Sequence, residues 1–95
     1  MEKEETKALE NAGFSKAEAL VYIALLRIGK TKSGNVIKHT GLQSSVVHNS
    51  LNSLIEKGFV NYVLENKLKS YSALSPKLIE EFIEQKKQEF KKILP

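Results

Sequence analysis

The sequence predicts a mainly α-helical domain that carries one small β-hairpin. Apolar residues recur at spacings of three and four over most of the chain, which is the period of helices with one buried face. Between residues 59 and 74 the period changes to two, which is typical of β-strands. Glycines follow the helical stretches and mark their ends, namely Gly13, Gly29, Gly41 and Gly58.

Length and composition limit the classes of protein to which the chain can belong. Its 95 residues suffice for one hydrophobic core and not for two. There is no cysteine, so neither a disulfide framework nor a thiolate metal site is expected. The net charge of +4 favours a polyanionic partner. Because no apolar run reaches the roughly 20 residues of a membrane span and the first residues are charged, we expect a cytoplasmic protein without a membrane partner.

Two helices are predicted in the first third of the chain. Residues 2–12 favour a short helix that ends at Gly13. A second helix is predicted over residues 15–28, because the side chain of Ser15 can accept a hydrogen bond from the Glu18 amide while the Glu18 carboxylate reaches back to Ser15. The apolar positions of this helix are Ala19, Tyr22, Ile23, Leu25 and Leu26.

The next two helices, predicted over residues 33–40 and 44–57, form a helix-turn-helix pattern. Ser33 is expected to cap the first of them, and Gly41 begins the short turn that separates the two. The positions expected to face inward are Val36 and Ile37 on the first helix and Val47, Leu51, Leu54 and Ile55 on the second. Two short helices around a glycine-containing turn are typical of DNA-binding proteins, in which the second helix is the recognition helix.

A wing and a last helix complete the predicted fold. Residues 59–64 and 69–74 alternate around a turn at 65–68, and a hairpin that directly follows a recognition helix is a wing. Ser75 and Pro76 begin a helix over residues 76–94. The predicted architecture is therefore a winged helix-turn-helix domain over residues 1–75, with residues 76–95 as an added C-terminal helix.

The C-terminal helix carries a wide apolar stripe. Its members are Ile79, Phe82, Ile83, Phe90 and Ile93. This stripe exceeds what one short domain is expected to cover, so it predicts a homodimer built by this helix. The alternative is that the helix folds back on its own core.

Several segments in order along the chain resemble the TrmB-like transcription regulators of archaea. The segment from Gly13 to Gly29 resembles their opening helix. The residues that resemble their recognition helix are Gly41, Ser45, Val47, Leu51, Ser53, Leu54, Glu56, Lys57 and Gly58, and those that resemble their basic wing are Lys67, Lys69 and Tyr71. The resemblance covers roughly residues 9–76 and implies a winged helix-turn-helix fold and binding of double-stranded DNA.

The sequence departs from the pattern of that family on the recognition helix. Ser44, Val46 and Asn52 stand where the family often carries Arg or Lys, so this helix has no positive charge before Lys57. Larger members of the family continue into a sugar-binding regulatory domain, and no small-molecule effector is implied for the present residues.

The recognition helix supplies the candidate base-reading residues, because its N-terminal side chains enter the major groove in this architecture. They are Gln43, Ser44, Ser45, Val46, His48, Asn49 and Asn52. Gln and Asn can make bidentate bonds to adenine, and a Val methyl can meet a thymine methyl. The alternative is a solvated polar helix face.

Candidate phosphate-binding residues come from three places around the recognition helix. Lys32, Ser33 and Gly34 stand at the start of the preceding helix, where free amides and the helix dipole favour an anion. Lys38 lies later on that helix; taken alone it is better explained as a solubilising charge, although the lysines as a set favour DNA. Lys67 and Lys69 belong to the wing.

No enzyme, cofactor or metal ion is predicted. His39 and His48 are nine residues apart, with no Cys or Asp to complete a ligand set, and no nucleophile, phosphate loop or acid pair is apparent. The favoured function is a sequence-specific transcription regulator that binds double-stranded DNA as a homodimer. Two alternatives remain, a winged-helix adaptor that binds protein and a non-specific chromatin-type DNA binder.

Overall fold

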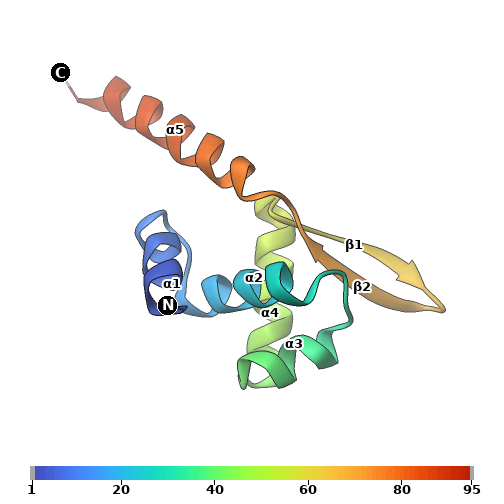
Figure 1. The fold of residues 1–95 in the computed structure, drawn as a ribbon. Coiled ribbons are helices and arrows are strands. Elements are labelled where there is room, and N and C mark those ends of the chain that lie inside the picture. The colour runs from blue at the N-terminus through green and yellow to red at the C-terminus, as the bar shows by residue number, and fades with distance from the viewer. Residues whose placement is uncertain (1, 95) are drawn as a thin grey trace.

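Five helices and one antiparallel hairpin make up the part of the chain that this computed structural model describes, residues 2–94 (Figure 1). Their order is α1 (Glu2–Asn11), α2 (Lys16–Ile28), α3 (Ser33–Thr40), α4 (Ser44–Lys57), β1 (Val60–Glu65), β2 (Leu68–Ala73) and α5 (Pro76–Ile93). The predicted mainly helical fold with a wing and an added C-terminal helix is confirmed. No helix among the described residues is long and apolar enough to cross a membrane.

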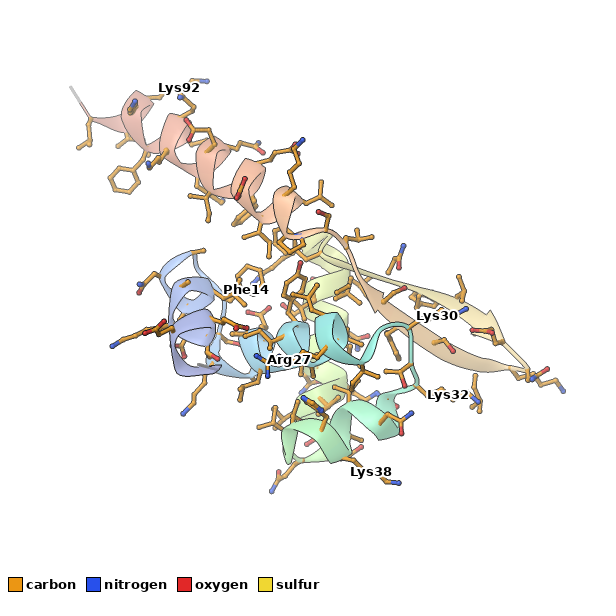
Figure 2. All side chains as sticks on the ribbon, in the orientation of Figure 1. Phe14, Arg27, Lys30, Lys32, Lys38 and Lys92 are labelled. Carbon is orange, nitrogen blue, oxygen red and sulfur yellow. The ribbon has the colours of Figure 1, made fainter. Side chains whose placement is uncertain are left out.

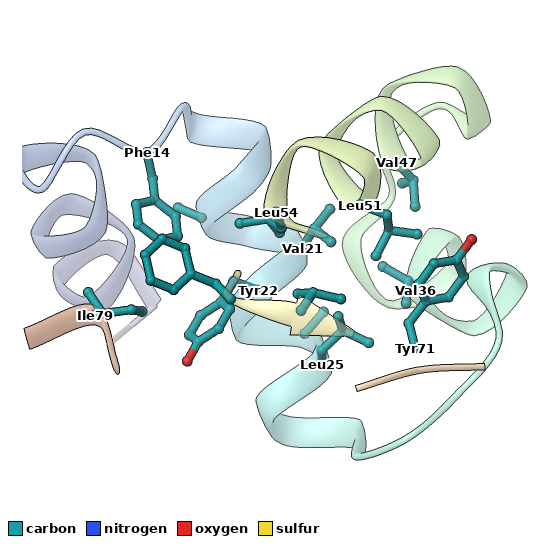
Figure 3. Packing of buried hydrophobic residues seen from close by; sticks show 14 residues of the cluster. Phe14, Val21, Tyr22, Leu25, Val36, Val47, Leu51, Leu54, Tyr71 and Ile79 are labelled. Atoms are coloured by element: carbon teal, nitrogen blue, oxygen red, sulfur yellow. The ribbon is translucent and has the colours of Figure 1, made fainter. Parts of the chain in front are cut away.

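Helix α2 is the centre of the core, and it packs against α1, α3, α4 and β2. The predicted capping box is present: the Ser15 hydroxyl accepts from the Glu18 amide at 3.0 Å, and the Ser15 amide donates to the Glu18 carboxylate at 2.8 Å. The side chains that fill the core come from α2, α3, α4, the start of α5 and both strands (Figure 3), and Leu9 of α1 packs against them partly buried. The largest fully buried ones are Tyr22, Leu25, Leu51, Leu54, Val21, Val36, Val47 and Val60.

The start of α3 differs from the prediction. Lys32, not Ser33, occupies the N-cap position, and it makes no side-chain capping bond. The cause is tertiary, because the backbone of Thr31 forms an isolated β-bridge with Tyr71, with N···O distances of 3.0 and 2.7 Å. This bridge holds Thr31 extended, so the helix begins directly after Lys32 and Ser33 becomes its first residue.

The turn of the hairpin also differs from the prediction, since it has two residues and not four. Asn66 and Lys67 both have positive φ, 52° and 67°, and Glu65 pairs with Leu68. Two central residues of positive φ are the pattern of a type I′ turn, whose twist matches the twist of the strands. Asn tolerates this conformation well, whereas Lys at the second position is unusual. The sequence signal was weak because no glycine follows Asn66.

Helix α5 leaves the domain after its first turns (Figure 1). Ser75 caps it, as predicted, through its hydroxyl and the Lys77 amide. Ile79 is only 6% exposed, and the ring of Phe82 meets the ring of Phe59 edge-on at 5.2 Å. The start of the predicted apolar stripe therefore packs on the core of its own chain. Its far end does not, because Phe90 is 63% and Ile93 78% exposed.

Candidate nucleic-acid interface

Helix α4 presents a polar face to the solvent because Val47, Leu51 and Leu54 on its other side are fully buried. Six of the seven candidate base-reading residues are exposed, namely Gln43, Ser44, Ser45, His48, Asn49 and Asn52. Val46 is half-buried, so less of its side chain faces the solvent than the sequence suggested. Gln43 is the N-cap residue and makes no side-chain capping bond, which leaves its amide group at the tip of the helix.

One groove brings together most of the candidate phosphate-binding residues, although they come from distant parts of the sequence. It is lined by Lys32, Ser33 and Gly34 at the start of α3, by His48 of α4, and by Lys67, Leu68, Lys69 and Tyr71 of the wing. We call this the α3–wing groove. Its walls combine three lysines with the free amides at the start of a helix, and such a combination attracts phosphate groups.

Two candidates lie outside the α3–wing groove. Lys38 projects from the last turn of α3, away from the hairpin and from Lys32 (Figure 2). Asn49 lines a separate shallow groove on the other flank of α4, next to Ser53 and Lys57. His48 and Asn49 therefore face different flanks of the recognition helix, with the exposed side of the helix between them.

The lysines differ in what they already contact. Lys30 pairs with Glu65 at 3.0 Å, and the hydrogen bond from Lys30 lowers the pKa of the Glu65 carboxyl below its ordinary value. The Lys69 ammonium lies over the Tyr62 ring, 4.5 Å from its centre. Within residues 2–94, neither Lys32 nor Lys67 forms an ion pair. Their charges are therefore available to an external anion.

The loop between α2 and α3 holds the wing in place. The bridge between Thr31 and Tyr71 adds this loop to the free edge of β2, and the Asn35 side chain donates to the Thr31 hydroxyl at 2.8 Å. The pair of Lys30 with Glu65 ties the same loop to the end of β1. The start of α3 and the wing are thus positioned as one unit, so the α3–wing groove is formed before any ligand arrives.

A buried acid, Glu18, joins α2 to the recognition helix, in addition to its predicted place in the capping box of α2. Glu18 accepts hydrogen bonds from the Ser53 hydroxyl and from the Lys57 ammonium, the latter at 2.9 and 3.0 Å. The ammonium also lies 5.6 Å from the centre of the Phe14 ring. Ser53 and Lys57 are four residues apart on α4, and this spacing is the signal that could have suggested a shared partner.

Opposing influences act on the pKa of Glu18. Burial by itself would raise the pKa, but hydrogen bonds from Ser15, Ser53 and Lys57 and the charge of Lys57 outweigh burial and lower it to about 2. The carboxylate is therefore charged throughout the physiological range. Since Lys57 is bound to it, the last cation of the recognition helix neutralises an internal acid.

Comparison with known proteins identifies the family of this chain. Residues 9–77 match the family described as "Sugar-specific transcriptional regulator TrmB". The chain belongs to the TrmB family. It is 31% identical over 83 residues to the HTH-type sugar sensing transcriptional regulator TrmBL1 of Pyrococcus furiosus, a match that covers 87% of the chain and 24% of that relative. This TrmB-family chain thus spans about a quarter of the length of the curated relative.

Solved structures with the same fold include DNA-binding proteins and regulators. The archaeal chromatin protein TrmBL2 superposes on 99% of this TrmB-family chain with a TM-score of 0.88 and 22% identity, over 38% of its own length. Protein ST1889 of Sulfolobus tokodaii superposes with a TM-score of 0.79 and 17% identity, over 96% of this chain and 99% of its own. A MarR family protein of Bacillus stearothermophilus superposes with a TM-score of 0.67 and 20% identity, over 98% of this chain and 69% of its own. Because these sequence identities are low, the structural similarity shows that the chain has the winged-helix fold and nothing further.

Proposed function

We propose that this chain binds double-stranded DNA as the sequence-reading domain of a TrmB-family transcription regulator. Residues 1–75 form the DNA-binding unit, with α4 in the major groove and the wing against the sugar-phosphate backbone. The observation that carries the proposal is the α3–wing groove, in which Lys32, Lys67 and Lys69 meet beside the exposed face of α4. When α4 lies in the major groove of a duplex, the sugar-phosphate backbone beside that groove lies against these three lysines.

The proposal assigns affinity and sequence readout to different residues. Lysines and helix-terminal amides bind phosphates, which carry no sequence information. The exposed polar side chains of α4 read base edges. Residues 44–52 contain no Lys, Arg or Glu, and His48 is their only ionisable residue. Mutations on α4 should therefore change specificity, whereas mutations in the α3–wing groove should change overall affinity.

Asn49 tests the assignment of readout to α4. It is exposed on the second turn, so its amide can make a bidentate contact to adenine. We expect Asn49→Ala to cost about 1 to 3 kcal/mol on a duplex selected from a random pool, and to leave binding to a scrambled duplex nearly unchanged. Competition binding with the two duplexes measures both values.

Asn11→Ala is the matched control for that experiment, because Asn11 is equally an exposed asparagine but lies at the end of α1. It should leave both affinities as in the unmodified protein. Equal losses on the selected and scrambled duplexes for Asn49→Ala, or no loss on either, would show that α4 does not read bases through this residue.

We further propose that α5 forms a homodimer through the exposed part of its apolar stripe. Because Ile79 and Phe82 contact the chain's own core, the surface left for a second copy consists of Ile83, Phe90 and Ile93. A two-fold axis through this helix would place two recognition helices in successive major grooves about 34 Å apart, which favours a palindromic site.

The double variant Phe90→Ser, Ile93→Ser tests the dimer. Both side chains project into solvent in the single chain, so their loss should leave the fold intact and shift sedimentation from dimer to monomer. Leu26→Ser, which alters an exposed leucine on α2, is the control and should remain dimeric. A monomer before any substitution, or a dimer that survives the double variant, contradicts this assignment.

A protein-binding adaptor is the second candidate, and the absence of charge on α4 favours it. Its exposed face carries no lysine or arginine before Lys57, and Lys57 is bound to Glu18. An adaptor would not bind duplex DNA at low salt, or would do so with an affinity insensitive to salt. A titration of duplex affinity against salt therefore separates the two functions.

A further inference from the structure

The start of α5 is joined to α2 and to the end of the recognition helix at one place. Leu74 lies between β2 and α5. Its amide donates to the Phe59 carbonyl at 2.9 Å, and its carbonyl accepts from the Tyr22 hydroxyl at 2.6 Å, across 52 positions of the sequence. Phe59 follows closely on the end of α4, and its ring meets the Phe82 ring of α5. We call these four residues, Tyr22, Phe59, Leu74 and Phe82, the α5 joint.

Tyr22 connects the α5 joint to the centre of the core. It stands in the middle of α2 and is only 1% exposed. The Phe14 ring packs edge-on against its ring, with the ring centres 6.1 Å apart. Burial raises the pKa of the Tyr22 hydroxyl above its ordinary value, so this group keeps the proton that it donates to Leu74. A buried hydrogen bond thus helps to fix the direction in which the chain enters α5.

Beyond the α5 joint, α5 projects away from the domain (Figure 1). A shallow groove separates its middle from the end of α1. The residues that line this groove are Asn11, Ala12, Ile83, Lys86, Lys87 and Phe90. Because α5 is not packed closely against α1 here, a change of angle at the α5 joint would turn the rest of the helix with it.

The length of α5 amplifies such a change of angle. From Ile79, which is buried against the core, to Ile93 the helix rises about 21 Å, at about 1.5 Å per residue. A turn of about 10° at the α5 joint therefore moves the far end of the helix by roughly 4 Å. This displacement is close to the rise of one base pair in a duplex, about 3.4 Å. A tilt that leaves the fold intact is thus large enough to matter for binding at two half-sites.

We propose that the α5 joint sets the distance between the two half-sites that the dimer binds, with Tyr22 as its positioning residue. The inference rests on the proposed function, in which the far end of α5 joins two copies and each α4 reads one half-site. The angle at the joint then decides how far apart the two recognition helices stand. A fixed angle selects one spacing, because one extra base pair moves a half-site by about 3.4 Å and turns it by about 34° around the duplex.

The test compares Tyr22→Phe with Tyr62→Phe in the full chain. Tyr22→Phe removes the hydroxyl that binds Leu74 and keeps the ring that packs against Phe14. Tyr62→Phe is the matched control, because Tyr62 is 42% exposed on β1 and its replacement removes a hydroxyl outside the α5 joint. A half-site taken from selected duplexes is built into inverted repeats whose centres are from about 8 to about 13 base pairs apart. Competition binding measures the affinity for each spacing.

For the unmodified protein and for Tyr62→Phe we expect one preferred spacing, with an affinity about tenfold lower when the spacing changes by one base pair. Tyr22→Phe should reduce this preference to about threefold or move the preferred spacing by one base pair. Its affinity for a single half-site and its sedimentation as a dimer should stay unchanged, because neither α4 nor the far end of α5 is altered.

Phe82→Leu is a second variant that loosens the α5 joint from the side of α5. It removes the edge-on ring contact with Phe59 and keeps an apolar side chain at a half-buried position. We expect it to change the spacing preference in the same way as Tyr22→Phe. Thermal melting of each variant verifies that it is folded.

The results that overturn this inference are distinct from those that overturn the proposed function. An unmodified protein that is a monomer, or that does not bind a duplex at low salt, rejects the proposed function and the inference with it. A dimer that binds every spacing equally, or variants of the joint that keep the spacing preference of the unmodified protein, reject the inference alone. Equal losses at every spacing for Tyr22→Phe also reject it, since the hydrogen bond then supports the fold or the dimer and not the spacing.

Discussion

Replacing Lys32, Lys67 and Lys69 together by alanine is expected to weaken duplex binding by two to three orders of magnitude near 0.1 M salt. The three lysines come from two elements and line one groove. Each phosphate contact contributes about 0.9 to the slope of log affinity against log salt, through release of counterions from the duplex. The slope should therefore become less steep by about 3 per subunit. Titrations by fluorescence anisotropy between about 0.05 and 0.3 M salt measure both effects.

The matched control removes three lysines outside the α3–wing groove, Lys7, Lys16 and Lys91, all of them exposed. Both triple variants lower the net charge of +4 by three, so a loss common to both reflects the overall field of the protein. We expect the control to keep most of the salt slope. A control variant that loses as much slope as the groove variant would mean that the groove has no special part in phosphate binding. If the slope of log affinity against log salt is near zero for the unmodified protein, lysine contacts to phosphates do not drive DNA binding.

Replacing Glu18 by glutamine is expected to reduce the free energy of unfolding at neutral pH by about 3 kcal/mol. The pKa of Glu18 is lowered to about 2 from an ordinary value of 4.5, and each unit of such a difference corresponds to about 1.4 kcal/mol. The charged form is thus favoured by folding. Its contribution to stability is complete above pH 4.5 and is lost as the pH falls from 4.5 towards 2. Urea denaturation at pH 7, 4 and 2.5 measures this dependence.

Glu56→Gln is the control for that series, because Glu56 is exposed on α4 next to Lys57. Its free energy of unfolding should equal that of the unmodified protein at every pH. Glu18→Gln should be less stable at pH 7 and should approach the stability of the unmodified protein as the pH falls towards 2. If the difference in free energy of unfolding between Glu18→Gln and the unmodified protein stays constant over this range, the carboxylate of Glu18 does not stabilise the fold through its charge.

The sequence by itself determined the helices, because their signals are local. A capping box at Ser15, glycines with positive φ at the helix ends and a Ser-Pro start for α5 all act within a few residues of the boundary they set. The apolar periods of three and four then decide which face each helix buries. The resemblance to the TrmB family was carried by the same positions, since most of them are core residues and helix ends.

Elements with weaker local signals were predicted less well. The hairpin was predicted, but its turn was placed over four residues because Asn66 is followed by Lys and not by Gly. The cap of α3 was assigned to Ser33 because serine is a good capping residue. In both places backbone pairing, and not the residue type, set the boundary: Glu65 pairs with Leu68 across the turn, and Thr31 pairs with the distant Tyr71. Such pairings have no period and no fixed spacing that a sequence can reveal.

The tertiary structure alone decided which charged and apolar side chains are available to a partner. Lys57 and Lys67 look alike in the sequence, yet Lys57 is bound to Glu18 39 positions away, whereas Lys67 faces the α3–wing groove. Ile79 and Ile93 belong to one helical stripe, but only Ile79 reaches the core, because α5 leaves the domain after its first turns. Availability is a property of what surrounds a side chain in space. It is therefore settled when segments far apart in the chain pack together, and it cannot be read from local composition or spacing.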